Sequence, residues 1–142
     1  MSQSAQDLQS WLAAFITKHG GIAGTVHLLT QEPTGPILAL AAWANIPPPV
    51  IAATRLIPKG KGMAGLAWER AEPVQTCNLA TDNTGDVRPG AKAVNAQAAV
   101  ALPVNGPAEE LRAVVGIAFL GEREFSDEAI AVLQRDASLL PE

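Results

Sequence analysis

The sequence contains few of the residues that several classes of protein need. One cysteine among 142 residues, Cys77, rules out an intramolecular disulfide and fits a reducing compartment. The chain has only two histidines in addition to that cysteine, too few for a dedicated zinc or haem site. The 10 Lys and Arg residues are outnumbered by 14 acidic residues and are scattered along the chain. Because nucleic-acid binding needs a basic stripe, we expect no nucleic-acid partner.

Targeting and membrane-spanning segments are also lacking. Met1–Asp7 has neither the basic start nor the apolar run of a secretory signal. The longest apolar run, Ile37–Ala44, is too short to cross a bilayer. We therefore expect a cytoplasmic protein without a membrane partner. The composition, 48% hydrophobic and 17% charged, is that of a folded chain, and the length predicts a single domain over residues 1–142.

Hydrophobic spacing predicts the elements of the N-terminal half. Apolar residues at helical spacing predict an amphipathic helix over Ala5–Lys18, which the two glycines after it stop. Two strands, Thr25–Thr30 and Ile37–Ala44, flank the tight reversal Gln31–Pro36 and predict an antiparallel hairpin. Shorter elements are expected at Val50–Arg55 (a helical turn), Leu56-Ile57 (an edge strand), Gly62–Ala71 (a helix) and Val74–Asn78 (a strand).

The C-terminal half has a long polar loop, two strands and a helix. The loop, Leu79–Asn95, is unusually long for a compact domain, and such loops often serve as lids or binding loops. Ala96–Val104 and Leu111–Leu120 are two apolar strands. Ser126 is a suitable N-cap for the last helix, since acidic residues follow it in the first turn.

The strands also predict the architecture. Hairpin turns favour antiparallel pairing, but three of the strands are apolar at nearly every position. An antiparallel sheet with one wet face would alternate apolar and polar residues, so both faces must be covered. The sequence therefore predicts an α+β fold in which a three-layer α/β/α sandwich surrounds an antiparallel sheet, with the terminal helices on one face.

The ordered motifs of this chain resemble those of a GAF domain. They are Ile57–Ala67, Glu72-Pro73-Val74, Ala96–Val104, Val114–Phe119 and Phe125–Glu128. The resemblance implies a six-stranded antiparallel sheet covered by helices on both faces, a GAF/PAS-like sandwich. It also implies a ligand cavity under the loop between the fourth and fifth strands. GAF domains bind cyclic nucleotides, bilins, haem or amino-acid-like metabolites, and many form homodimers through their terminal helices.

Three departures narrow what the resemblance implies. The chain has no Asn-Lys pair, and the motif at Phe125–Glu128 lacks the spacing of cyclic-nucleotide GAF domains. Cys77 precedes Asn78 rather than the histidine that follows a bilin-attaching cysteine. The free methionine sulfoxide reductases of this type keep cysteines in the loop that corresponds here to Asp86–Asn95, which contains none. The sequence names no cofactor and no catalytic residue.

The long loop holds the dense polar cluster of the chain. Its side chains could close over a polar ligand, with Arg88 or Lys92 meeting a carboxylate or phosphate, or they could form a solvated loop. Trp43 and Trp68 could add flat apolar walls or belong to the core. The candidate ligand-binding residues are Trp43, Trp68, Asp82, Asn83, Asp86, Arg88, Lys92, Asn95 and Gln97.

A glycine motif and the two histidines are further candidates for structural or binding roles. Gly60–Gly65 matches G-x-G-x-x-G, which suits either a structural turn or an anion near the Gly62 amide and Lys61. A dinucleotide site would need a long parallel strand before the motif, and the sequence has none there. His19 fits a helix C-terminus. His27 lies within a strand and fits either a satisfied, half-buried group or a ligand.

Three hypotheses for the function follow. The first is a sensory domain that binds a small molecule and acts in trans on a signalling partner. The second is an interaction or homodimerisation module with a vestigial pocket. The third is an enzyme of the free methionine sulfoxide reductase type that uses Cys77.

Overall fold

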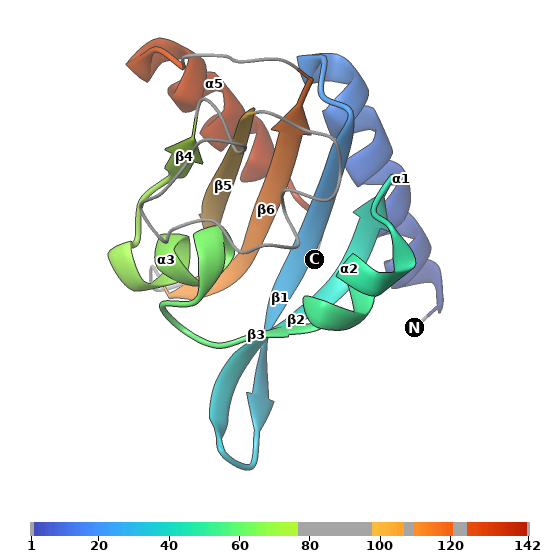
Figure 1. Ribbon diagram of the computed structural model, residues 1–142, viewed down its shortest axis with the longest axis vertical. Coiled ribbons are helices and arrows are strands. Elements are labelled where there is room, and N and C mark those ends of the chain that lie inside the picture. Colours follow the sequence, from blue (N-terminus) through green and yellow to red (C-terminus); the bar gives the residue numbers. More distant parts are fainter. Residues whose placement is uncertain (1, 77–97, 107–109, 121–124, 142) are drawn as a thin grey trace.

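A computed structural model describes residues 2–76, 98–106, 110–120 and 125–141. Its centre is one antiparallel sheet with the strand order β3-β2-β1-β6-β5-β4 (Figure 1). The six-stranded antiparallel sheet that the family resemblance implied is confirmed. The strands are β1 (Ala23–Glu32), β2 (Gly35–Ala44), β3 (Leu56–Ile57), β4 (Val74–Thr76), β5 (Ala98–Asn105) and β6 (Leu111–Phe119).

Helices cover both faces of this sheet, as the apolar strands predicted (Figure 1). The terminal helices α1 (Ser2–His19) and α5 (Asp127–Ala137) share one face, where α1 packs on β1 and β2 and α5 packs on β5. The short helices α2 (Pro48–Ala53) and α3 (Gly62–Arg70) lie on the other face, and α3 packs on β5 and β6. The three-layer arrangement is therefore confirmed.

The two larger buried clusters, one on each face, follow from the alternation of side chains along the strands, and a small third one forms around Ala23 and Ala118. One cluster lies on the face that the terminal helices α1 and α5 cover, called the helical face below. There Leu12, Phe15 and Leu133 of these helices pack on alternate strand residues such as Val26 and Val115. The intervening strand residues point to the other face. There the buried cluster consists of Leu38, Ile57, Ala67, Val74, Ala101 and Val114.

The β1–β2 hairpin is longer than the sequence predicted. Strand pairing continues to Glu32 and Gly35, so the reversal between the strands is Pro33-Thr34 rather than the whole of Gln31–Pro36. Gly35 has a φ of 123°, a conformation that favours glycine. Within the described residues, β3 pairs with β2 only at Leu38 and Ala39. Pro36 has no backbone N–H, and because β3 does not reach it, no hydrogen bond between β2 and β3 is lost there.

The start of α5 is the one that the sequence predicted. Ser126 Oγ accepts a hydrogen bond from the backbone N–H of Ala129 at 3.1 Å. Phe125 and Ile130 stand at the two positions of a hydrophobic staple, and both pack against the helical-face cluster. The cap and the staple together fix the residue at which α5 begins.

A carboxylate on α5 joins the ends of the two terminal helices. Asp136 is buried, and its Oδ2 lies 2.8 Å from Nε2 of His19 and 2.9 Å from Nζ of Lys18, both on α1. The hydrogen bond from Lys18 lowers the pKa of Asp136, burial opposes that effect, and the hydrogen bond from His19 adds to it. Sequence analysis placed His19 at a helix end but missed this partner, 117 positions away.

Asp136→Asn is expected to lower the free energy of unfolding by about 1–2 kcal/mol at neutral pH, since charged hydrogen bonds to a buried group are lost. A carboxyl with a lowered folded pKa contributes stability above its unfolded pKa, about 3.9, and loses it as pH falls through the folded value. Urea unfolding should therefore show the gap between wild type and variant shrinking below about pH 4.

Asp127→Asn is the matched control, because Asp127 lies exposed in the first turn of the same helix. It should cost no more than about 0.5 kcal/mol. A gap for Asp136→Asn that is the same at pH 3 and pH 7 would contradict the ionic link.

Candidate functional site

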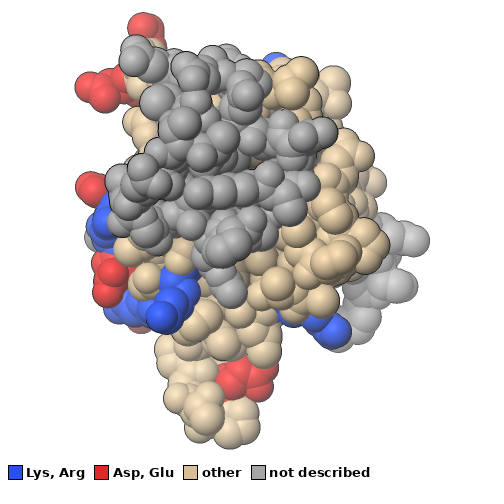
Figure 2. Space-filling view, viewed as in Figure 1, with Lys and Arg blue, Asp and Glu red and all other residues tan. Residues whose placement is uncertain are grey.

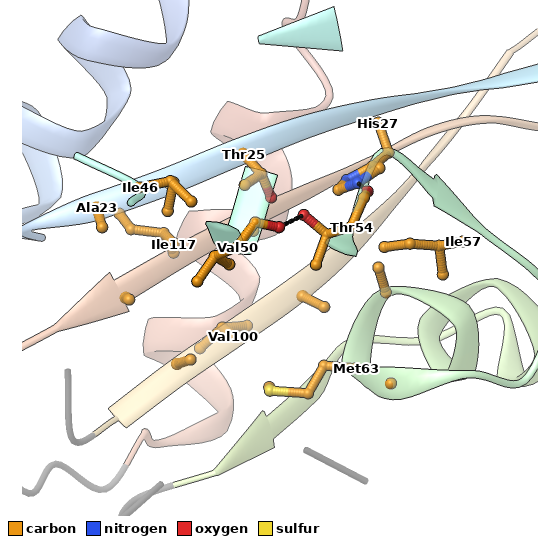
Figure 3. A pocket seen from close by; sticks show the side chains of 17 residues that line it. Ala23, Thr25, His27, Ile46, Val50, Thr54, Ile57, Met63, Val100 and Ile117 are labelled. Atoms are coloured by element: carbon orange, nitrogen blue, oxygen red, sulfur yellow. Dashed lines mark hydrogen bonds between the residues drawn. The ribbon is translucent and has the colours of Figure 1, made fainter. Parts of the chain in front are cut away.

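A cavity of about 150 Å³ lies on the sheet face opposite the terminal helices. Strands β1, β5 and β6 form its floor, and α2 and α3 form walls (Figure 3). The residues lining it are mostly apolar. They are Ala23, Gly24, Thr25, His27, Ile46, Val50, Thr54, Ile57, Gly62, Met63, Ala64, Ala99, Val100, Ala101, Gly116, Ile117 and Ala118.

Small residues at alternate positions of the floor strands make room for the cavity. On this face β5 places Ala99 and Ala101, and the neighbouring β6 places Gly116 and Ala118. The residues between them, such as Ile117, border the cavity as well but belong to the buried cluster on the other face of the sheet. Protein interiors are otherwise close-packed, so a void of this size is a feature of this sheet face.

His27 attaches α2 to the floor of the cavity. Its side chain is 2% exposed, and Nε2 lies 2.9 Å from the backbone oxygen of Thr54, the residue that ends α2. Because a carbonyl oxygen only accepts, Nε2 carries the proton. Thr54 Oγ1 donates in turn to the Val50 backbone oxygen at 2.8 Å. This bond agrees with the expectation that His27 is a hydrogen-bonded group within a strand, but the side chain is buried rather than half-buried.

Thr25 lies two residues before His27 and points into the same space (Figure 3). It pairs with Gly116 of β6, where an ideal Cβ would lie 2.9 Å from Thr25 Oγ1. No motif in the sequence marks Thr25 or Gly116 as a site residue. The available signal was the alternation of polar Thr25 and His27 with apolar Val26 and Leu28, which marks one polar strip on an otherwise apolar sheet.

Neither tryptophan among the predicted ligand-binding residues lines the cavity. Trp43, near the end of β2, is 40% exposed, and its backbone bonds to the side chain of Gln9 on α1. Trp68 packs against the cluster beneath α3, with Lys59 Nζ 5.8 Å from its ring centre. The other seven candidates lie outside the described residues and stay predictions. They are Asp82, Asn83, Asp86, Arg88, Lys92, Asn95 and Gln97. Cys77 also lies outside the described residues.

The glycine motif has a backbone explanation. Gly60 and Gly62 have φ values of 84° and 65°, which favour glycine. An ideal Cβ at Gly65 would lie 2.6 Å from the Pro58 backbone oxygen. The strand before the motif, β3, has two residues and is antiparallel to its neighbour. This geometry agrees with the structural turn rather than a dinucleotide site, while Gly62 itself lines the cavity.

Charged side chains near the site are of both signs. Positive and negative side chains are mixed on the exposed surface in and beside α3 (Figure 2). They belong to Lys59, Lys61, Glu69, Arg70 and Glu72. Among the described residues, no three His, Cys, Asp or Glu side chains gather as a metal site would require. None of the described helices has the length and apolar character needed to cross a membrane.

Comparison with known sequences gives one family. The family model described as a GAF domain matches residues 3–140, nearly the whole chain. No curated protein sequence matches the chain significantly.

Solved structures with similar folds come from proteins of different kinds. The type II free methionine-R-sulfoxide reductase from Thermoplasma acidophilum is 18% identical with a TM-score of 0.75, over 98% of this chain and 90% of that one. The GAF domain region of a putative membrane protein from Geobacter sulfurreducens PCA is 11% identical with a TM-score of 0.76, over 97% and 90%. NreA from Staphylococcus aureus, mutated in its nitrate binding site, is 14% identical with a TM-score of 0.66, over 84% and 89%. At these identities the likeness concerns the fold alone.

Proposed function

The chain belongs to the GAF domain family, and on that premise we propose that it is a regulatory module that holds a small molecule and acts on a signalling partner. The observation that carries the proposal is the cavity of about 150 Å³ between the sheet, α2 and α3. The cavity is partly open to solvent, and its apolar lining lacks the contacts that close packing would supply. A bound molecule would recover those contacts.

The positions of the walls support a regulatory role. α2 is a helix of six residues with one buried side chain, Val50. Short elements with few contacts open at lower free energy than the core of a domain. A ligand that contacts the sheet and both helices would stabilise one arrangement of this surface, and a partner could then distinguish the occupied form.

Native mass spectrometry of the purified protein tests the proposal. We expect a reproducible mass increment above the calculated mass of the chain, which marks a retained small molecule. Ala99→Leu should abolish that increment, since three added carbons project from β5 into the cavity. Ala131→Leu, on the exposed surface of α5, is the matched control and should keep it.

The same spectra separate the alternatives. A clean mass without increment in the wild type, at twice the chain mass, would replace the proposal with a homodimerisation module. Val132 and Leu139 on and after α5 are exposed and would be candidates for that interface. Consumption of free methionine-R-sulfoxide by the wild type, lost in Cys77→Ala, would replace it with the reductase that similar folds include.

A further inference from the structure

The size of the cavity limits the ligand to a small molecule. A cavity of about 150 Å³ lined by apolar side chains in another protein takes up benzene. The cavity here has a similar volume, about 150 Å³, and a similarly apolar lining, although it is partly open to solvent. A ring or compact aliphatic body of about six to eight non-hydrogen atoms therefore fills it.

The described lining contains no side chain of fixed charge. Its polar side chains are Thr25, His27 and Thr54. Two of these have partners inside the protein, since His27 Nε2 donates to the Thr54 backbone and Thr54 Oγ1 donates to the Val50 backbone. A charged ligand would lose its hydration against this wall without an opposite charge to replace it, which is costly. The part of the lining that the structure describes favours an uncharged molecule.

Thr25 supplies the polar contact. Among the residues that the structure describes, its hydroxyl group makes no hydrogen bond, and it points into the cavity (Figure 3). The missing side chain of Gly116 leaves this hydroxyl its space, because a Cβ there would approach Oγ1 to 2.9 Å. Thr25 Oγ1 is not among the buried side-chain atoms that lack a partner, so water can reach it when no ligand fills the cavity. A ligand that displaces this water must offer the hydroxyl group a hydrogen-bond partner, or the lost bond costs free energy.

Resting on the proposed function, we propose that the ligand is an uncharged, mostly apolar molecule of about the size of a substituted benzene ring, with one hydroxyl group that bonds to Thr25 Oγ1. A hydroxyl both donates and accepts, so it matches the threonine in either direction. The first turn of α3, at Gly62, Met63 and Ala64, also lines the cavity, and the N–H groups of a first helical turn have no partner within their own helix.

Matched probes test this assignment. Phenol and toluene have nearly the same shape and differ by hydroxyl against methyl, while benzoate and nitrate carry a negative charge. Calorimetric titration of the purified protein should show that phenol binds about fivefold more tightly than toluene, which is the effect of one net hydrogen bond. Benzoate and nitrate should bind at least about tenfold more weakly than phenol.

Thr25→Val should reduce the preference for phenol over toluene to about onefold while toluene affinity is kept, because only the hydroxyl is lost. Thr25→Ser, which keeps a hydroxyl, should retain the preference and serves if the valine variant does not fold. Thr30→Val is the matched control on the same strand, since Thr30 lies outside the cavity and bonds to the Leu28 backbone.

Equal affinities for phenol and toluene, or a preference that survives Thr25→Val, would overturn the assignment. Tighter binding of benzoate or nitrate than of phenol would overturn it too, but would leave the proposed function standing. If none of the four probes binds, the retained molecule in the mass spectrum decides: a charged one refutes the assignment and an uncharged alcohol or phenol supports it. No probe binding and no retained molecule would refute both proposals.

Discussion

Gly65→Ala is expected to lower the free energy of unfolding by about 2–4 kcal/mol, the range of severe steric changes in a packed site. Helix propensity alone predicts the opposite sign, since alanine is about 1 kcal/mol better than glycine inside a helix. In this chain the added Cβ would lie 2.6 Å from the Pro58 oxygen and 3.1 Å from the Gly60 nitrogen. Both are backbone atoms, so no side chain can rotate away.

The clash also affects the cavity. Gly60 N donates to Gly65 O at 2.9 Å, and Gly65 N donates to Lys61 O at 3.0 Å. A shift of α3 that relieves the clash would strain these bonds and move the first turn of the helix, which lines the cavity. We therefore expect weaker ligand retention together with the lower stability.

Urea unfolding and native mass spectrometry measure the two effects. Gly106→Ala is the control, because the nearest atoms to its ideal Cβ are side-chain atoms of Arg112 at 3.4 and 3.6 Å. That substitution should change stability by no more than about 1 kcal/mol. If Gly65→Ala were as stable as wild type or more so, the close approach of α3 to Pro58 would be refuted.

The elements and layers of this fold could be predicted from the sequence because they depend on local patterns. Apolar residues at nearly every position of β5 and β6 required cover on both faces, and Ser126 marked the start of α5. Hairpin turns settled the pairing of β1 with β2. Each of these inferences uses residues that are neighbours in the sequence.

The cavity could not be predicted in the same way, because it depends on register between distant segments. Thr25 faces Gly116 only because β1 pairs with β6 at that step, and a one-residue slip would turn Thr25 to the helical face. His27 meets Thr54 through the position of α2, and His19 meets Asp136 through the packing of α1 near α5. No periodicity in the sequence encodes these distances.

His27→Ala is expected to lower the free energy of unfolding by about 3 kcal/mol, since it enlarges a buried cavity and leaves the Thr54 carbonyl without this donor. The larger consequence concerns α2. Besides buried Val50, this helix is held by the His27 bond and by the bond from Leu40 N to Arg55 O at 2.8 Å, just after it. Without His27, the amides of residues 50–54 should exchange with solvent through a local opening.

Leu28→Ala separates that local effect from a general loss of stability. Leu28 follows His27 on β1 but packs on the helical-face cluster, and its truncation should cost about 2 kcal/mol. Hydrogen exchange should then rise in α2 of His27→Ala beyond the change in global stability, and follow global stability in Leu28→Ala. If α2 kept its protection in His27→Ala, the helix would be anchored by other contacts, and the wall that α2 gives the cavity would not depend on the histidine. The predicted outcome would make His27 the residue through which the cavity floor controls the position of that wall.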